Sequence, residues 1–508
     1  MRSDETLSEA SYKSGAGPSI VESFAIDGLH GFLSISFASK RAATVLIARN
    51  GSGKTTLMGA LDAFLKRQFF RLKDLQFDKM TCKLSTVGDE LVVTRNDIES
   101  ILAVPNDLEL NRLSQKTEIS ERVIYQFIVG EWNFSRKNLA WLDNDVFRKL
   151  VRAMDYDHSK TADWLDKAAS RFLEKSPGLK NTLSKLDDAL GDFEIVYLPT
   201  YRRIELALER DDAGLGSRRR PPALMLAGSL FTGDMQFGLS DIADRLRELN
   251  HQIVAESGFG YRKLSANIIN DLLDGQIEQQ SEKEKSRPST DDLKLFFSRL
   301  EASKRTGPYY MDKLPDLEKL ERDDFTKGES GRFLLYFLDQ LRKVIDSTKE
   351  KELLVDQFVS SCNKYLSSEH DTADGFSEQG SKASYRVGEK VLKLNRADLS
   401  VLVETKYGDR KIPLDSLSSG EKQMISLFAK LYLYPRDKIV LIDEPELSLS
   451  IDWQRSILVD ILKAPLCRQV VAITHSPFVF DNELEPYARS IKVTSIGSAQ
   501  KVPEADEK

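Results

Sequence analysis

Hydrophobic and polar residues alternate from Ile20 to residue 37, and this pattern predicts two short strands joined in the region of Asp27 and Gly28. Residues 44–47 then form a continuous apolar run, as strands buried in a parallel sheet do. Residues 54–66 carry apolar side chains at helical spacing and predict an amphipathic helix. With the glycine-rich stretch between them, the order is strand, loop, helix.

The middle of the chain, residues 67–396, is predicted to be mostly helical, with a few strands such as 194–199. Apolar positions at 331–366 predict one long helix or two joined helices. They do not sustain heptads, which argues against a very long coiled-coil arm. Near the C-terminus, apolar runs at 439–442 and 470–474, each next to a helical pattern, predict successive β/α units of one sheet.

Composition narrows the class of protein without identifying it. The chain has 508 residues, of which 41% are hydrophobic and 30% charged, as in ordinary globular proteins. Its net charge of −6 gives no general basic signature for nucleic acid. Three widely spaced cysteines argue against a disulfide framework or a zinc site and favour a reducing cytosol. No apolar run is long enough to span a bilayer, and residues 1–19 lack the apolar core of a signal peptide, so we predict a cytoplasmic protein without membrane contact.

The glycine-rich stretch at 48–55 matches the phosphate-loop pattern G-x-x-x-x-G-K-[ST], except that Ala48 replaces the first glycine. Glycines let the backbone curl so that successive N–H groups face a phosphate. Lys54 is expected to reach the β- and γ-phosphates of ATP, and the Thr55 hydroxyl is expected to bind Mg²⁺. The predicted nucleotide-binding residues of this loop are Asn50, Gly51, Ser52, Gly53, Lys54, Thr55 and Thr56.

Two carboxylates, Asp443 and Glu444, follow the apolar run at 439–442 directly. A buried parallel strand would deliver both acids to the edge of the sheet where the phosphates bind. Asp443 would then hold Mg²⁺, and Glu444 would orient and deprotonate the attacking water. The alternative is that the two acids only cap a following helix, where the helix dipole favours negative charge.

Residues 417–423 read Leu-Ser-Ser-Gly-Glu-Lys-Gln and open a predicted helix, so their N–H groups would form a second anion site. The stretch resembles the signature sequence of ABC-type ATPases, in the variant of the SMC-like and OLD-type members. In that family the signature binds the γ-phosphate held by the opposite subunit, so two chains enclose two ATP molecules. The resemblance assigns this role to Ser418, Ser419, Gly420 and Glu421.

His475 ends the run at 470–474, where ABC-type ATPases carry a switch histidine that senses the γ-phosphate. A structural histidine is the alternative. Residues 447–450 occupy the place of the family's D-loop, but Ser450 stands where the resembling families often have Asp or His. The family's glutamine loop has only Gln236 as a weak candidate.

A basic run at 218–220 has Arg202 and Arg203 nearby in the sequence, and two interpretations are open. One is that these arginines contact the phosphates of DNA or RNA. The other is that the run is a solvated loop.

The order of motifs, with Leu417 standing 363 positions after Lys54, resembles ABC-type ATPases of the SMC, OLD and RecF kind rather than transporter subunits. The segments Leu-Pro-Thr-Tyr-Arg-Arg at 198–203, Leu-Asp-Ser at 414–416 and Glu-Pro-Glu-Leu-Ser-Leu-Ser at 444–450, with Trp453 and Gln454, are similar to the PtuA family. These are ATPase subunits of Septu anti-phage systems, which also occur beside some retrons. OLD-type nucleases carry a Toprim nuclease after the ATPase, and the 33 residues after His475 are expected to be too few for one.

The resemblance implies an α/β P-loop ATPase head with a large, mostly helical insertion between the phosphate loop and the signature. The predicted divisions are a disordered arm at 1–19, the N-terminal lobe of the head at 20–66, the insertion with some head strands at 67–396, the C-terminal lobe at 397–496 and a polar tail at 497–508.

It also implies that the chain hydrolyses ATP to ADP and phosphate, with ATP and Mg²⁺ as ligands, and forms a homodimer or higher homo-oligomer. Its expected partner is a separate HNH nuclease subunit, with a reverse transcriptase, retron DNA or other nucleic acid as further candidates. One alternative is a DNA-repair ATPase, similar to SMC and RecF proteins, that clamps DNA by ATP-dependent dimerisation. Another is a nuclease within the insertion, although no metal-spaced acidic cluster in the sequence supports it.

Overall fold

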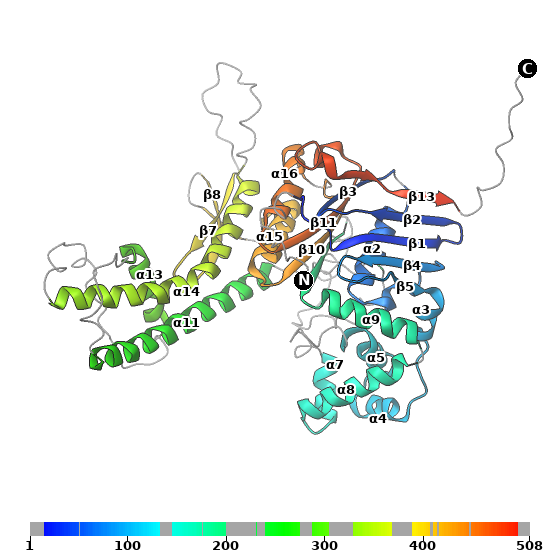
Figure 1. The fold of residues 1–508 in the computed structure, drawn as a ribbon, viewed down its shortest axis with the longest axis horizontal. Helices are drawn as coiled ribbons and strands as arrows, with labels where there is room; N and C mark the ends of the chain where they lie inside the picture. Colours follow the sequence, from blue (N-terminus) through cyan, green and yellow to red (C-terminus); the bar gives the residue numbers. More distant parts are fainter. Residues whose placement is uncertain are drawn as a thin grey trace, which may run out of the picture. The chain divides into compact units, whose positions relative to one another are not determined.

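The computed structural model describes residues 15–49, 51–132, 145–174, 176–199, 230, 239–274, 287–303, 329–367, 389–406, 410–413, 416–446 and 449–495. The chain divides into two compact units (Figure 1). The first contains Met1–Gln236 and Pro435–Lys508, and the second contains Phe237–Tyr434. Each unit is described by itself below. The divisions at 66 and 396 drawn from the sequence remain predictions.

A parallel sheet lies at the centre of the first unit. Its strands, in spatial order, are β12 (Ala488–Ser490), β3 (Ala43–Ile47), β11 (Cys467–Thr474), β10 (Asp437–Asp443) and β6 (Phe193–Leu198). All four neighbouring pairs are parallel. The apolar runs of β3, β10 and β11 are almost fully buried, which explains why the sequence shows continuous apolar residues rather than alternation. The strands expected at 44–47, 194–199, 439–442 and 470–474 are therefore confirmed.

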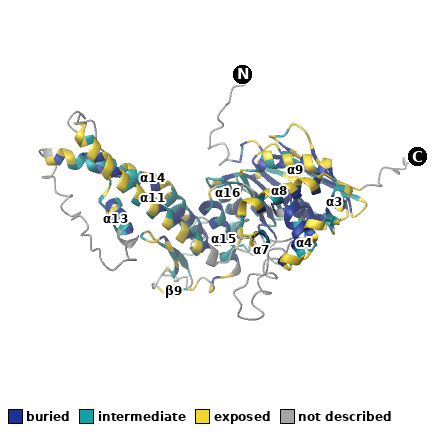
Figure 2. Ribbon diagram, turned by 90° about the horizontal axis from the view of Figure 1, so that it is seen from below, coloured by how far each residue is buried: buried dark blue, intermediate teal, exposed yellow. Residues whose placement is uncertain are grey.

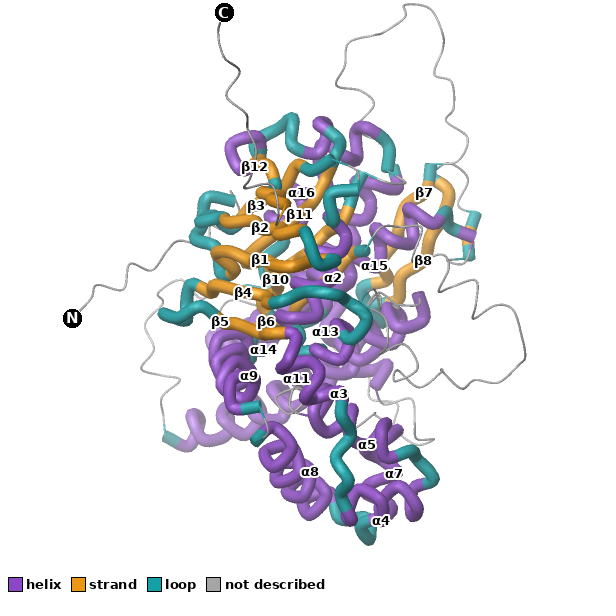
Figure 3. The backbone as a smooth tube through the Cα atoms, turned by 90° about the vertical axis from the view of Figure 1, so that its right-hand side faces the viewer, coloured by secondary structure: helices purple, strands orange, loops and turns teal. Residues whose placement is uncertain are grey.

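An antiparallel sheet accompanies it in the same unit (Figure 3). Its order is β13 (Lys492–Ser495), β2 (Leu33–Ala38), β1 (Val21–Leu29), β4 (Lys79–Leu84) and β5 (Leu91–Thr94). The helix α2 (Lys54–Leu65) shares one hydrophobic core with both sheets, and ten of its 12 residues are buried. The amphipathic helix expected after the glycine-rich loop is confirmed, and it contributes most of its surface to the core.

The turn between β1 and β2 is not where the sequence pattern placed it. The strand β1 continues through Asp27 and Gly28 to Leu29, and the chain reverses at residues 30–32. Gly28 has a φ of +71°, and a Cβ atom there would lie 2.1 Å from Asp78 Oδ2. Glycine is therefore required by a register shift within the strand, between Ile26 and Leu29, and not by the turn itself.

One buried glutamine joins the two sheets. Gln469 on β11 is fully buried, and its Oε1 accepts hydrogen bonds from the N–H groups of Ile20 (2.9 Å) and Val21 (2.8 Å). Its Nε2 donates to the Val21 carbonyl at 3.0 Å. The amide thus satisfies the backbone groups at the start of β1, which would be costly to bury without partners. This contact fixes the antiparallel sheet against β11, the strand directly before His475.

Most of the remaining helices of the first unit extend the same core. These are η1 (Phe69–Leu72), α3 (Arg95–Leu102), α4 (Leu108–Thr117), α5 (Glu121–Gln126), η2 (Phe127–Trp132), α7 (Asp145–Ala153), α8 (His158–Leu173) and α9 (Pro177–Leu190). The unit also contains α16 (Ile451–Lys463), η9 (Pro477–Val479) and η10 (Glu485–Tyr487). Part of the expected helical insertion therefore belongs to the core of the first unit. None of the helices within the described ranges combines the length and apolar character needed to cross a bilayer.

Long helices dominate the second unit. Its elements are α11 (Leu239–Leu273), α13 (Thr290–Ser303), α14 (Glu329–Leu366), β7 (Lys390–Asn395), β8 (Ser400–Thr405), β9 (Lys411–Ile412) and α15 (Ser419–Leu433). The stretch predicted as one or two helices is one helix, α14, of 38 residues. It pairs with α11, and both helices bury one face and expose another (Figure 2). The pair is antiparallel, because Tyr336 near the start of α14 contacts Asp271 near the end of α11.

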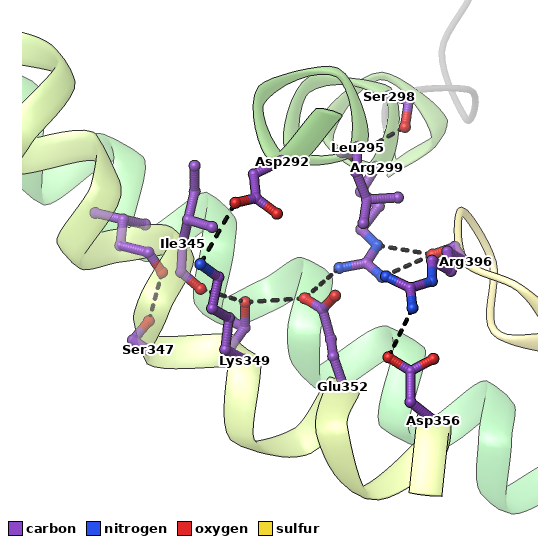
Figure 4. Close-up of polar contacts among 12 residues, drawn as sticks. Asp292, Leu295, Ser298, Arg299, Ile345, Ser347, Lys349, Glu352, Asp356 and Arg396 are labelled. Carbon is purple, nitrogen blue, oxygen red and sulfur yellow. Dashed lines mark hydrogen bonds and ion pairs between the residues drawn. The ribbon is translucent and has the colours of Figure 1, made fainter. Parts of the chain in front are cut away.

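A buried guanidinium connects three elements of this unit (Figure 4). Arg299 on α13 donates from Nε and Nη2 to the carbonyl of Arg396, at 3.1 and 2.6 Å, in the turn between β7 and β8. Its Nη1 donates to Glu352 on α14 at 2.6 Å. The side chain of Arg396 in turn donates to Asp356 on α14 at 2.9 Å. The β7–β8 hairpin is therefore fastened to the long helices, and the same hairpin carries a lysine that contacts the signature motif.

Candidate nucleotide-binding site

The three predicted motifs of the first unit meet at one edge of the parallel sheet. Ile47, the last residue of β3, pairs with Thr474 on β11. Ile473 on β11 pairs with Asp443, the last residue of β10. Because these strands are parallel and neighbouring, the phosphate loop, His475 and the two acids all follow their carboxyl ends. That edge is where ligands bind in open α/β sheets.

The phosphate loop has the backbone that its glycines predict. Gly51 and Gly53 have φ values of +79° and +82°, in the left-handed region that side chains disfavour. A Cβ atom on Gly51 would meet nothing within 4 Å, so the loop encloses open space at this point. Gly53 precedes α2, and no side chain caps the first N–H groups of the helix. An uncapped helix N-terminus beside an open loop is a ready site for a phosphate.

Lys54 and Glu444 form an ion pair across this edge. Lys54 Nζ lies 2.8 Å from Glu444 Oε1, and the two side chains are 6% and 17% exposed. The loop lysine thus contacts the acid predicted to act as general base, although 390 residues separate them in the sequence. Both groups are predicted to act on the same phosphate, and their contact shows that the two side chains lie next to each other.

Glu444 itself has an uncommon backbone. Its φ is +54°, a left-handed value that non-glycine residues rarely adopt. Its N–H donates to the Ile473 carbonyl at 2.8 Å, which continues the pairing of β10 with β11 past the last strand residue. Strained backbone of this kind persists where the surrounding structure imposes it, and it occurs often at functional sites. Here it turns the chain sharply after Asp443, between the two acids.

The residues at this edge fit a nucleotide phosphate with a magnesium ion. Ser52 Oγ is buried and makes no hydrogen bond to the described residues, so the loop holds a donor ready for a ligand oxygen. Thr55 is the second residue of α2, Asp443 is 2% exposed, and α2 packs against β10. A hydroxyl and a carboxylate are oxygen ligands of the kind that Mg²⁺ prefers. Bound there, the ion would neutralise charge on the phosphate oxygens.

A cavity of about 620 Å³ adjoins the loop. It is lined by Ile47, Ala48, Arg49, Ser52, His475, Ser490, Ile491 and Val493. The loop and the imidazole of His475 therefore face one space. A larger hollow of about 850 Å³ lies along Asp27, Lys79 and Arg95 and contains none of the predicted site residues. In this hollow, Arg95 Nη1 already donates hydrogen bonds to three backbone carbonyls. We therefore place the site at the smaller cavity.

His475 lies between two glutamates. Its Nδ1 is 2.8 Å from Glu446 Oε1 and 3.7 Å from Glu444 Oε1. The imidazole is 45% exposed, whereas Glu446 is almost completely buried. The structure therefore brings together Lys54, Glu444 and His475, which were predicted as catalytic from separate motifs. Their roles remain predictions.

The signature residues belong to the second unit and begin α15. Ser418 Oγ accepts a hydrogen bond from the Glu421 N–H at 3.3 Å, and Glu421 Oε2 accepts one from the Ser418 N–H at 2.7 Å. This reciprocal arrangement is a capping box. Lys390 on β7 donates to both Glu421 oxygens, at 2.9 and 2.8 Å. Glu421 therefore orders the start of the helix, and together with Ser418 and Gly420 it belongs to the predicted second anion site.

The charge state of Glu421 makes this cap sensitive to pH. Burial raises the pKa of Glu421, but hydrogen bonds from Lys390 and Ser418 outweigh that effect and leave the pKa below its ordinary value. A lowered folded-state pKa stabilises the fold above the ordinary glutamate pKa, and the stabilisation is lost as the pH falls through the lowered value. We expect Glu421→Gln to cost about 1 kcal/mol at pH 7, the usual value of a helix cap. The difference in melting temperature from the wild type should close in acid.

The matched control is Glu350→Gln, which changes an exposed glutamate on α14. It should leave the melting temperature unchanged across the same pH range. An undiminished difference between Glu421→Gln and the wild type at acidic pH would contradict the predicted role of the carboxylate charge.

Three functional candidates were missed from the sequence as individual residues: Glu446, Gln454 and Lys390. Glu446 and Gln454 stand in the segments that resemble the PtuA family, but no chemistry was assigned to them. Glu446 contacts His475, Gln454 contacts Ser476, and Lys390 contacts Glu421. No local sequence pattern indicates such contacts.

Several predicted residues lie outside the described part of the chain. Asn50 of the phosphate loop, Gln236, the arginines at 202–203 and those at 218–220 are among them. Nothing about their placement is inferred.

Comparison with known proteins gives a family match over part of the chain. A family model described as "AAA domain, putative AbiEii toxin, Type IV TA system" matches residues 257–481. The matched stretch includes the signature, both acids and His475 but begins after the phosphate loop. A search of curated proteins found no match. Among solved structures, the chain is similar to the Smc head domain with an extended coiled coil bound to the C-terminal domain of ScpA, from Pyrococcus furiosus. The identity is 13%, the TM-score is 0.32, and the match covers 94% of this chain and 96% of that one.

The parallel sheet, the phosphate loop at its edge and the AAA match define the class of the protein. The chain has the α/β fold of a P-loop ATPase, and the stretch that matches the AAA family model includes residues of both units.

Proposed function

We propose that the chain binds and hydrolyses ATP with the residues at the edge of the parallel sheet. The contact between Lys54 and Glu444 is the observation that carries this proposal. In the proposed reaction Lys54 leaves Glu444 to bind the β- and γ-phosphates, and Thr55 and Asp443 hold the magnesium ion. Glu444, released from its ion pair, then accepts a proton from the attacking water. Phosphoryl transfer of this kind depends mainly on positioning and electrostatic stabilisation.

The exchange of partners makes chemical sense at this edge. A buried or half-buried lysine and glutamate without ligand stabilise each other, because an unpaired charge is costly to bury. A nucleotide offers Lys54 more negative charge than one carboxylate does. Glu444 would therefore be released from Lys54 only when ATP binds. Without ATP, the ion pair would keep Glu444 from acting as a base.

The proposed active form is a homodimer or higher homo-oligomer in which the signature of one chain completes the site of another. Support comes from the capping box at Ser418 and Glu421, which orders the N-terminus of α15. An ordered helix start with a buried glycine, Gly420, offers N–H groups to a phosphate oxygen. ATP bound between two subunits would couple dimerisation to nucleotide state.

We further propose that this ATPase belongs to an anti-phage defence complex of the Septu type and regulates a separate HNH nuclease. The support is the similarity of residues 198–203 and 444–450 to the PtuA family, together with Trp453 and Gln454. The matching AAA family is itself described as a putative toxin of a type IV toxin–antitoxin system. In the retron-associated form of the proposal, a reverse transcriptase or retron DNA is a further component.

The alternative is an ATP-dependent DNA clamp similar to SMC and RecF proteins. The antiparallel pair of long helices, α11 and α14, is the feature that favours it. The two proposals differ in what the isolated chain does with DNA and in which protein accompanies it.

A pull-down of the chain from its native host, with mass measurement of the intact complex, distinguishes the two. With ATP present, we expect the chain as a dimer or larger oligomer together with an HNH nuclease. Purified alone, it should convert ATP to ADP and phosphate. Tight, ATP-dependent DNA binding by the isolated chain, without a nuclease in the native complex, would support the clamp instead. A chain that binds no ATP would contradict both.

A further inference from the structure

We infer that Glu446 and Gln454 form a bracket that positions His475 for ATP hydrolysis. The inference rests on the proposed ATPase function and adds two positioning residues to it. Both residues lie in the first unit, Glu446 just after β10 and Gln454 in the first turn of α16. Together they contact the residues next to His475 and the segment that follows Glu444.

Glu446 holds the end of β11 through both carboxylate oxygens. Its Oε2 accepts a hydrogen bond from Thr474 Oγ1 at 2.8 Å, and its Oε1 accepts one from the His475 N–H at 3.0 Å. The same Oε1 lies 2.8 Å from His475 Nδ1. Thus one carboxylate, with its side chain 4% exposed, contacts the backbone and the ring of His475 and the preceding hydroxyl. Because a buried carboxylate is costly without hydrogen-bond partners, these contacts hold Glu446 and His475 in one arrangement.

Gln454 joins the same region from the other side. Its Nε2 donates to the carbonyls of Glu446 (3.3 Å) and Leu449 (3.0 Å), and its Oε1 accepts a hydrogen bond from Ser476 Oγ (2.9 Å). Two acceptors on one side of the amide and a donor on the other fix which atom is nitrogen. The amide therefore ties the segment after Glu444 to the residue that follows His475.

Gln454 also contacts residues 449 and 450, the described part of the segment that corresponds to the D-loop. Ser450, the residue that departs from the resembling families, is the N-cap of α16 and accepts a hydrogen bond from the Trp453 N–H at 3.4 Å. Leu449, directly before it, is the residue bonded by Gln454. The serine thus has a local structural role, and the connection between this segment and His475 runs through Gln454.

The bracket holds His475 but leaves part of its ring exposed to the cavity, which is why we assign it a role in catalysis. Glu446 occupies the Nδ1 side of the imidazole, while the ring is still 45% exposed and lines the cavity beside the phosphate loop. Glu446 touches no predicted substrate position and acts through His475, which makes it a positioning residue.

The test is a double-mutant cycle of Glu446 and His475 in the full-length protein. We expect Glu446→Ala to lower kcat by about 10- to 100-fold, less than the roughly 10²- to 10⁴-fold that an acid–base group itself contributes, because Glu446 acts through His475. Its affinity for ATP should change by less than about twofold, because the phosphate loop is intact. In a His475→Ala background the same substitution should lower kcat no further, since coupled residues give non-additive effects. Glu446→Gln keeps the size and one acceptor and should have a smaller effect.

Asp437→Asn is the matched control. Asp437 lies at the opposite end of β10 and pairs with Arg468, so this variant should keep the wild-type kcat. If Glu446→Ala fails to fold, Gln454→Ala takes its place in the same cycle, with thermal melting as the check on folding. A full loss of rate on top of His475→Ala would overturn the inference, as would wild-type rates in both bracket variants. A wild-type protein that binds ATP without hydrolysing it would instead refute the proposed function.

Discussion

Glu444→Gln is expected to retain ATP and to lower the rate of hydrolysis by about 10²- to 10⁴-fold, the usual contribution of a general base. The amide has nearly the size of the carboxylate but cannot accept a proton from water at neutral pH. Phosphate release under steady-state conditions measures the rate. Denaturing the protein after incubation and identifying the released nucleotide shows whether ATP or ADP was bound. The variant should contain ATP.

The ion pair with Lys54 sharpens this prediction. In the wild type, the phosphate must replace Glu444 as the partner of Lys54, whose Nζ lies 2.8 Å from the carboxylate. A glutamine oxygen still accepts a hydrogen bond from the lysine but offers no charge. ATP affinity should therefore be equal to that of the wild type or tighter, and the ATP-dependent oligomer should last longer.

A control for loss of charge is Glu483→Gln, which removes an exposed acid that pairs with Lys463 in the same unit. It should keep the wild-type rate and release of product. Normal turnover by Glu444→Gln would show that another group is the general base. Loss of ATP binding in that variant would show that the carboxylate helps to hold the nucleotide.

The parts of the fold that the sequence predicted correctly are those whose signal is local. The strand at 44–47, the loop and α2 follow one another in the chain, and each has a periodicity or a glycine pattern of its own. The same is true of β10 and of α15, the helix that residues 417–423 were predicted to open. Burial on both faces made β10 a continuous apolar run.

What the sequence could not supply is the set of neighbours. The strand β6 pairs with β10 although about 240 residues separate them, and nothing local to either strand specifies that pairing. The turn after β1 was misplaced because Asp27 and Gly28 have turn-like composition, whereas the glycine is needed to avoid Asp78. A long-range contact that demands a small residue is indistinguishable from a turn in the sequence alone.

The candidate site shows the same division. Lys54, Asp443, Glu444 and His475 were identified from motifs, and parallel pairing brings their segments to one edge. The partners of these residues were not identified, because a motif lists side chains and not contacts. Glu446 looked like one acid among several until its oxygens were found on Thr474 and His475.

Lys54→Ala is expected to lower ATP affinity by at least about 100-fold, which corresponds to about 2.7 kcal/mol. Lys54 would make charge-assisted hydrogen bonds to two phosphates, each worth about 1.5–3 kcal/mol. Isothermal titration with a non-hydrolysable ATP analogue measures the change. The control is Lys40→Ala, an exposed lysine before β3, which should bind the analogue as the wild type does. Retained affinity in Lys54→Ala would disprove the phosphate-loop assignment.

Removing the lysine has a second consequence that the ion pair makes testable. Glu444, left at the same edge without its partner, would present an uncompensated negative charge to the incoming phosphates. Part of the lost affinity should therefore be repulsion and not the missing bonds. The double variant Lys54→Ala with Glu444→Gln removes that charge, and we expect it to bind the analogue more tightly than Lys54→Ala does. Equal affinities of the two variants would mean that Glu444 turns away once Lys54 is gone, so that the pair, and not the strand edge, holds the carboxylate at the site.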